Sequence, residues 1–282
     1  MEEKKYPRWL ETTISVGAEK PFRAVHMSDT HLTLADDRDD ERKLALAEQR
    51  KKYFSQAELL CKEAAAYAKK EGLPIFHTGD LLDFVSWANL DAARAFAEEN
   101  DLFMAAGNHE FSLYVGEAVE DAAYRAQSLD KVQAAFKNDI RFSVRRENGV
   151  NFVALDNSYY LVEAWQLDAL KKVVAEGLPV VLLLHNPLYC EELYQLEMER
   201  NKGACAYLMA VPEEKMAGYE PSRLRQQKAD AITMEAYEYM TSEPAIRAIL
   251  AGHLHRDGVY AINDRLDQYV TGTRTLRVVT FE

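Results

Sequence analysis

Five short motifs that combine histidine with carboxylate or amide side chains follow one another along the chain. In order they are Asp29-Thr30-His31, Gly79-Asp80-Leu81-Leu82-Asp83, Gly107-Asn108-His109-Glu110, the lone His185, and Gly252-His253-Leu254-His255. The chain has seven histidines, and five of them lie in these motifs. Residues two apart on an extended chain point to the same side, so each DxH or HxH pair can present two donor atoms to one place. Together the motifs offer enough ligands for two metal ions.

The donor types indicate which metals are expected. Imidazole, carboxylate and amide donors without thiolate favour Mn, Fe or Zn over Cu(I) or an iron–sulfur cluster. Cys61, Cys190 and Cys205 lie outside the motifs and have no CxxC spacing, so we expect reduced thiols. Taken singly, each motif is more typical of a polar turn than of a ligand set. The occurrence of all five in order favours metal binding.

Each motif directly follows a run of apolar residues. The runs span residues 22–27, 73–76, 102–106, 180–184 and 248–251. Such runs, separated by helical segments, are typical of strands covered on both faces, and α/β folds place their chemistry at the carboxyl ends of these strands. We therefore expect the five motifs to converge.

The remaining elements are read from periodicity and from turn residues. Residues 9–16 and 22–27 predict a pair of strands, and Asn148-Gly149 predicts a hairpin between 141–146 and 150–155. Terminal strands are expected at 259–262, 268–271 and 276–281. Helix is expected over about 39–71, over 86–99 and over 163–176, and one or two helices are expected over 112–136. We expect a single domain over 1–282, with a mainly helical insertion or cap at about 188–243.

Composition favours an enzyme of small substrates. With 282 residues and 48% apolar content the chain can bury a substantial core. Its formal net charge of −12 disfavours long nucleic acid as a partner. The first residues lack the apolar stretch of a secretory signal, and no apolar run approaches the roughly 18 residues that span a bilayer. We therefore expect no membrane partner and a cytoplasmic location; protein partners are left open.

The ordered motifs resemble the signature of the calcineurin-like metallophosphoesterases, which reads DxH, GDxxD, GNH(D/E), H and GHxH. All five parts are intact between residues 29 and 255. The resemblance implies a four-layer α/β/β/α sandwich, in which two mixed β-sheets are flanked by helices and a dinuclear centre lies at one edge.

The resemblance also implies two ligand sets that share Asp80. One metal would be held by Asp29, His31, Asp80 and His255. The other would be held by Asp80, Asn108, His185 and His253. The implied reaction is in-line attack of a metal-bridged hydroxide on phosphorus, with both cations polarising the phosphoryl oxygens. His109 would give a proton or a hydrogen bond to the leaving oxygen, and Asp83 would orient His109.

The expected substrate is a small phosphodiester or a nucleotide, with Mn as the first choice of metal and Fe or Zn as alternatives. Asp83 is followed by Phe84-Val85, whereas the related protein phosphatases continue with Arg-Gly, so protein phosphatase activity is disfavoured. The terminal GHxH is typical of the branch that includes class III cyclic-nucleotide phosphodiesterases. Alternatives are a phosphomonoesterase or pyrophosphatase acting on a small metabolite and, less favoured, a nuclease or a non-catalytic scaffold.

Several polar residues near the motifs are given no role. His26 and His77 lie within apolar strands and are expected to be hydrogen-bonded core residues. Asn157 and Ser158 fit a polar turn at a strand end. The cations of the insertion fit solvated surface positions. Its aromatic residues are explained equally well by packing and by stacking on a base. The residues concerned are Arg200, Lys202, Arg223, Arg225, Tyr189, Tyr194 and Tyr207.

Overall fold

The computed structural model describes residues 7–117 and 121–282. One sheet contains β1 (Arg8–Ile14), β2 (Phe22–Met27), β3 (Ile75–His77), β4 (Leu102–Met104) and β11 (Thr275–Phe281). The other contains β5 (Phe142–Glu147), β6 (Val150–Leu155), β7 (Val180–Leu183), β8 (Ile246–Ala251), β9 (Gly258–Asn263) and β10 (Leu266–Val270). Their strand orders are β1-β11-β2-β3-β4 and β5-β6-β7-β8-β10-β9, and each sheet mixes parallel with antiparallel pairs.

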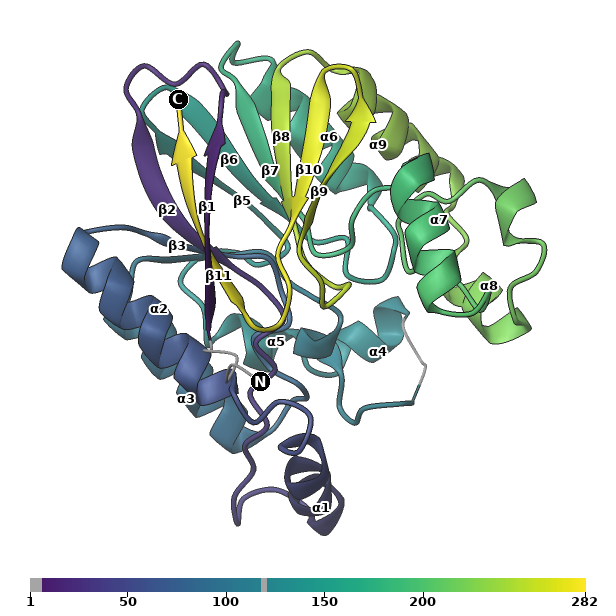
Figure 1. Cartoon of the computed structure of the whole chain (residues 1–282). Coiled ribbons are helices and arrows are strands. Elements are labelled where there is room, and N and C mark those ends of the chain that lie inside the picture. Colours follow the sequence, from purple (N-terminus) through teal and green to yellow (C-terminus); the bar gives the residue numbers. More distant parts are fainter. Residues whose placement is uncertain (1–6, 118–120) are drawn as a thin grey trace, which may run out of the picture.

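The two sheets face each other, and helices cover their outer faces (Figure 1). The space between the sheets is filled by apolar side chains from both, including Phe76, Phe152 and Phe281. The helices α2 (Ala57–Glu71) and α3 (Trp87–Glu99) pack on the first sheet, whereas α6 (Ala164–Val174) and α9 (Ala231–Ser242) pack on the second. The predicted four-layer α/β/β/α sandwich is confirmed.

The remaining helices are short and lie nearer the motif loops. They are α1 (Glu41–Arg50), η1 (His109–Phe111), α4 (Ala122–Ala126), α5 (Leu129–Gln133), α7 (Glu191–Arg200), η2 (Glu213–Met216) and α8 (Pro221–Gln227). The segment from 188 to 230, which holds α7, η2 and α8, stands beyond the end of the second sheet (Figure 1). No helix among the described residues is long and apolar enough to cross a membrane.

Local sequence signals explain several element ends. The Ser86 side chain accepts a hydrogen bond from the Asn89 backbone N–H and caps α3, as expected from its position. Gly72 ends α2 in the left-handed conformation, with φ of 68°. Asn148 and Gly149 both have positive φ and form the two-residue turn of the predicted β5–β6 hairpin.

Two sequence-based element predictions are wrong. β1 and β2 do not pair, because β11 lies between them, parallel to β1 and antiparallel to β2. The helix expected over 39–71 is two helices, interrupted between Arg50 and Ala57. The segment 112–136 holds two short helices among its described residues, α4 and α5, as expected; the expectation also covers 118–120, which lie outside the described residues.

Candidate metal centre

The five motifs meet at one edge of the sandwich, where strands from both sheets end. Backbone hydrogen bonds tie their loops together: Asp29 N–H donates to Gly79 O, His31 N–H to Asp80 O, and Gly252 N–H to His185 O, at 2.9 to 3.0 Å. The first sheet supplies the loops after β2, β3 and β4, and the second supplies those after β7 and β8. The convergence expected from the sequence is therefore present in the structure.

Asp29, His31 and His255 form the first group of facing donor atoms. The Nε2 atoms of His31 and His255 lie 3.0 Å apart, and Asp29 Oδ1 lies 3.4 Å from His255 Nε2. Asp29 Oδ1 is buried and has no hydrogen-bond partner among the described residues. A buried carboxylate oxygen without a partner is costly unless a cation satisfies it, so this atom fits a metal ligand.

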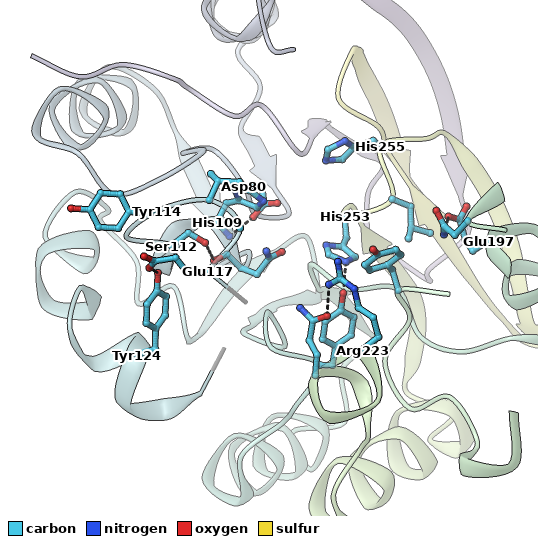
Figure 2. A pocket seen from close by; sticks show the side chains of 18 of the residues that line it. Asp80, His109, Ser112, Tyr114, Glu117, Tyr124, Glu197, Arg223, His253 and His255 are labelled. Atoms are coloured by element: carbon cyan, nitrogen blue, oxygen red, sulfur yellow. Dashed lines mark hydrogen bonds between the residues drawn. The ribbon is translucent and has the colours of Figure 1, made fainter. Parts of the chain in front are cut away.

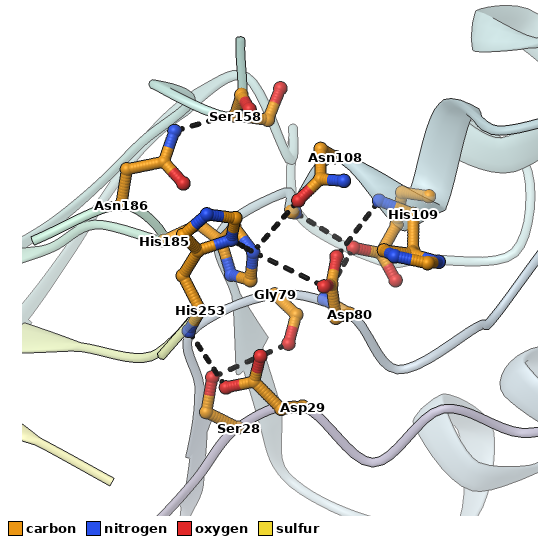
Figure 3. Close-up of polar contacts among 12 residues, drawn as sticks. Ser28, Asp29, Gly79, Asp80, Asn108, His109, Ser158, His185, Asn186 and His253 are labelled. Carbon is orange, nitrogen blue, oxygen red and sulfur yellow. Dashed lines mark hydrogen bonds and ion pairs between the residues drawn. The ribbon is translucent and has the colours of Figure 1, made fainter. Parts of the chain in front are cut away.

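Asp80, His185 and His253 form the second group, joined by Asn108 (Figure 3). His185 Nε2 lies 3.2 Å from Asp80 Oδ2, 3.2 Å from Asn108 Oδ1 and 3.1 Å from His253 Nδ1. Asp80 Oδ2 also lies 3.7 Å from His31 Nε2 of the first group. Asp80 therefore stands between the two groups, as a bridging carboxylate must.

Hydrogen bonds on the far side of the rings fix which nitrogen faces the centre. His185 Nδ1–H donates to Thr78 O at 2.7 Å, which leaves Nε2 free to bind. His253 Nε2 lies 2.7 Å from the Tyr160 hydroxyl, which leaves Nδ1 facing His185. Such outer partners orient metal-binding imidazoles and raise their basicity.

The backbone of the site is strained where the donor atoms are presented. Five of the predicted ligands have positive φ, between 51° and 68°, although none is glycine. These residues are Asp29, His31, Asp80, His253 and His255. Residues other than glycine rarely adopt this conformation, and such strain concentrates at functional sites.

Two glycines allow the loops to pack this closely. A Cβ on Gly107 would lie 2.2 Å from Asp80 Oδ1, and one on Gly252 would lie 1.8 Å from Ser28 Oγ. No side chain fits at either position without displacing a residue of the centre, so the Gly-Asn and Gly-His dipeptides of the motifs have a steric reason.

Burial and mutual interaction shift the pKa values of the cluster in opposite directions. Burial raises the pKa of Asp29 to about 6. Burial alone would lower the pKa of His185, but the Asp80 and Asp29 carboxylates outweigh it and raise the value to about 10. Burial opposes ionisation of Asp80, yet the surrounding histidines hold its pKa well below the usual range. The cluster thus attracts positive charge, and metal binding would displace the His185 proton.

Asp83 contacts His31, a candidate metal ligand, and His109, the predicted proton donor. Its carboxylate accepts a hydrogen bond from His31 Nδ1 at 2.9 Å and two from Arg50, at 2.6 and 2.9 Å. His109 Nδ1–H instead donates to the backbone carbonyl of Asp83 at 2.7 Å, while the carboxylate lies 3.4 Å away. Asp83 therefore orients His31 through its side chain and His109 mainly through its main chain.

The His109 ring lies at the edge of a cavity of about 410 Å³ (Figure 2). Its backbone N–H donates to Asp80 Oδ1 at 2.8 Å. Burial would lower the pKa of His109, but Asp80 and Asp83 outweigh it and raise the value above the ordinary range. With Nδ1 engaged by the carbonyl, Nε2 is the atom available to a ligand in the cavity.

Sequence reasoning assigned no role to three residues that support the centre. Glu110 is buried and accepts hydrogen bonds from the backbone N–H groups of Asp80, Leu82 and Gly107, and burial raises its pKa to about 7. Its place in the GNHE motif was the available signal. Arg50 and Tyr160 lie in segments without a motif, so no sequence signal pointed to them.

The polar residues set aside in the sequence lie behind the centre. His26 Nε2 bonds to Thr78 Oγ1 and His77 Nε2 to Thr30 Oγ1, both at 2.9 Å and fully buried. They are hydrogen-bonded core residues, as expected. Asn157 Oδ1 accepts the backbone N–H groups of His185 and Asn186, and so positions the loop after β7.

Comparison with known proteins identifies the family of the chain. The family model of the calcineurin-like phosphoesterases matches residues 22–257. No curated protein sequence matches the chain. Similar solved structures include a dimetal phosphatase from Danio rerio, with 14% identity, a TM-score of 0.49, and coverage of 90% of this chain and 88% of the other. They also include phosphopantetheinyl hydrolase from Mycobacterium tuberculosis, with 12% identity, a TM-score of 0.42, and coverage of 93% and 90%.

A putative 5′-nucleotidase from Staphylococcus aureus is also similar, with 13% identity and a TM-score of 0.41, over 90% of this chain and 49% of that one. The family match spans most of the chain and includes every strand-end motif described above. The chain therefore belongs to the calcineurin-like phosphoesterase family and is a metal-dependent phosphoric ester hydrolase.

Proposed function

We propose that the protein hydrolyses a small phosphodiester or a nucleotide. The observation that supports this substrate class is the position of the candidate ligands between two cavities. One cavity, of about 410 Å³, opens towards α7 and α8, and the other, of about 440 Å³, opens towards α1; His255 lines both. A phosphorus bound at the ligands thus has room for a substituent on each side, which a diester needs and a monoester does not.

The donor atoms fit the two divalent metal ions that the family binds. Asp29, His31, Asp80 and His255 would hold one ion. Asp80, Asn108, His185 and His253 would hold the other. Oxygen and imidazole donors without thiolate suit Mn, Fe or Zn, and we propose Mn. When bound, such a pair of ions supplies an activated water for in-line attack and stabilises charge on the phosphoryl oxygens.

His109 is the proposed proton donor to the leaving oxygen. Its Nδ1–H is held by the Asp83 carbonyl, so its Nε2 is left for the substrate. The ring is 18% exposed and lines the cavity of about 410 Å³ that opens towards α7 and α8. Asp83, which is fixed by Arg50, would keep both His31 and His109 in place. A general acid at this position lowers the barrier to departure of an alcohol.

The charge of the chain is the second argument for a small substrate. Glu117 and Glu197 both line the cavity of about 410 Å³, and the whole chain carries a formal net charge of −12. Both carboxylates are paired with arginines, so the net negative charge of the chain would be what repels the repeated phosphates of a long nucleic acid. A small ester reaches the centre with only one or two charges to accommodate.

The test compares bis-p-nitrophenyl phosphate with p-nitrophenyl phosphate, using protein stripped with a chelator and reloaded with Mn. We expect metal-dependent cleavage with preference for the diester, and impaired turnover in His109→Ala. Preference for the monoester would replace the proposal with a phosphomonoesterase. Inactivity on both compounds with two metals bound would contradict hydrolysis of simple esters at this centre.

A further inference from the structure

We propose that Arg223 binds a second anionic group of the substrate, a phosphate carried by the leaving alcohol, and so selects doubly charged substrates. The inference rests on the proposed phosphoesterase function and names the substrate class more narrowly. Arg223 lies on α8 and lines the same cavity as His109 and His253 (Figure 2). Figure 2 shows Arg223 beside His253 and across the cavity from Asp80 and His109.

The ring of Tyr207 contacts both Arg223 and the candidate ligand His253. The guanidinium carbon of Arg223 lies 5.2 Å from the centre of the Tyr207 ring, and that ring lies 6.0 Å from the ring of His253. Tyr207 adopts a positive φ of 55°, a conformation that residues other than glycine rarely adopt, and its ring contacts both side chains. Arg223 is therefore close to the candidate ligand His253 without belonging to the ligand cluster, so it can contact a second group of a substrate bound there.

The charge of Arg223 is not neutralised within the described part of the chain. Among the described residues, the Arg223 side chain donates a hydrogen bond from Nη1 to the amide Oε1 of Gln226, at 2.7 Å. The Arg223 side chain forms no ion pair with a described residue. An amide oxygen orients a guanidinium without cancelling its charge. The fork of donors that remains matches the geometry of a phosphate.

The other charged residues of the cavity wall already have partners. Glu197 pairs with Arg256 at 2.8 Å and with Arg200 at 3.6 Å, and Glu117 pairs with Arg42 at 3.0 Å. Arg200 also donates to the carbonyl of Leu254 at 2.6 Å. These contacts fix the wall but leave its charges balanced. Arg223 is the cation that remains for a ligand.

Position separates Arg223 from the neighbouring cations of the same segment. Lys202 and Arg225 are exposed and do not line the cavity, whereas Arg223 is half-buried in its wall. Arg225 lies only two residues away on the same helix, so it provides a matched control. The sequence does not separate these three cations, whereas their positions in the structure do.

The test measures binding to Mn-loaded protein by calorimetry. One probe is benzylphosphonate, and the other is 1,4-phenylenebis(methylphosphonate), which carries two phosphonates separated by one ring. We expect the bisphosphonate to bind about tenfold or more tightly than the monophosphonate, since a charged hydrogen-bonded contact contributes about this much. Arg223→Gln should reduce that ratio to about two, the statistical value, and Arg225→Gln should leave it unchanged.

An equal ratio in the native protein and Arg223→Gln would overturn the proposal, as would native protein with no preference for the bisphosphonate. Metal content and thermal unfolding of each variant check that the fold and the centre persist. Because the readout is binding, it is separate from turnover. Inactivity towards bis-p-nitrophenyl phosphate would contradict the proposed function without changing the affinity ratio.

Discussion

The two walls of the catalytic cavity are built in different ways. One wall is the ligand cluster, in which five loops follow buried strands, bond to one another through their backbones and hold strained residues. The other is the helical segment 188–230, whose cavity-lining side chains, apart from the buried Glu197, are half-buried or exposed. The cluster provides chemistry shared by a whole family. The helical wall has no shared signature and is where this chain can differ in its choice of substrate.

Arg50 and Arg223, one in each wall, differ in whether they are paired with a carboxylate. In the cluster Arg50 is bound by the Asp83 carboxylate through two hydrogen bonds and serves as a structural cation. In the helical wall Arg223 is held by an aromatic ring and an amide. A neutralised arginine fixes a geometry, whereas an arginine with neutral partners retains charge for a ligand. Variants of each wall should therefore affect different properties.

The largest effect is expected from Asp80→Asn, which removes the charge shared by the two ligand groups. The variant should lose bound metal, and its activity should fall to that of chelator-stripped protein, because the two cations supply several kcal/mol of charge stabilisation. Elemental analysis gives the metal content, and circular dichroism checks the fold. Full metal stoichiometry in the folded variant would rule out Asp80 as a bridging ligand.

His109→Ala should separate proton donation from metal binding. The variant keeps every predicted ligand, so we expect two bound metals and turnover reduced by about a hundredfold or more, as for a lost general acid. The loss should grow with the pKa of the leaving group, which a series of aryl methyl phosphates measures. A uniform loss across that series would indicate a role in binding instead.

The difference between the walls also explains what the sequence revealed. Strand-end motifs are short-range patterns, and the family signature that they match implies all seven candidate ligands. Arg50 reaches Asp83 across 33 residues and Tyr160 reaches His253 across 93, and neither pairing leaves a local pattern. Arg223 was one of several similar cations until its position in the cavity was known.

The same reasoning applies to the fold. Hairpin β5–β6 and the start of α3 depend on neighbouring residues and were predicted correctly. The pairing of β1 with β11 joins the two ends of the chain, and no local rule places β11 between β1 and β2. Contacts of large sequence separation are specified by global packing, which turn and periodicity rules do not describe.

A pair of glycine substitutions sharpens the contrast between the walls. In Gly107→Ala the new Cβ would lie 2.2 Å from Asp80 Oδ1, so Asp80 must move and metal affinity should fall by about 10- to 100-fold. Gly218→Ala, in the helical segment, meets no atom within 4 Å and should leave metal affinity unchanged. Competition with a metal-sensitive dye gives both affinities. Equal metal affinities of the two variants would contradict the view that only the ligand cluster lacks space for an added Cβ.

The smallest effect is expected from Tyr160→Phe, which removes one hydroxyl behind the cluster. The ring can keep its place in the core, but His253 loses the partner 2.7 Å from Nε2 that holds Nδ1 towards the metal. We expect metal affinity to fall by about tenfold, at the low end for such outer partners, with thermal stability nearly unchanged. Tyr189→Phe is the matched control, because its hydroxyl bonds to Glu191 at the surface. If both variants bind metal like the native protein, the Tyr160 hydroxyl does not orient His253, and the strained backbone of His253 is sufficient to do so.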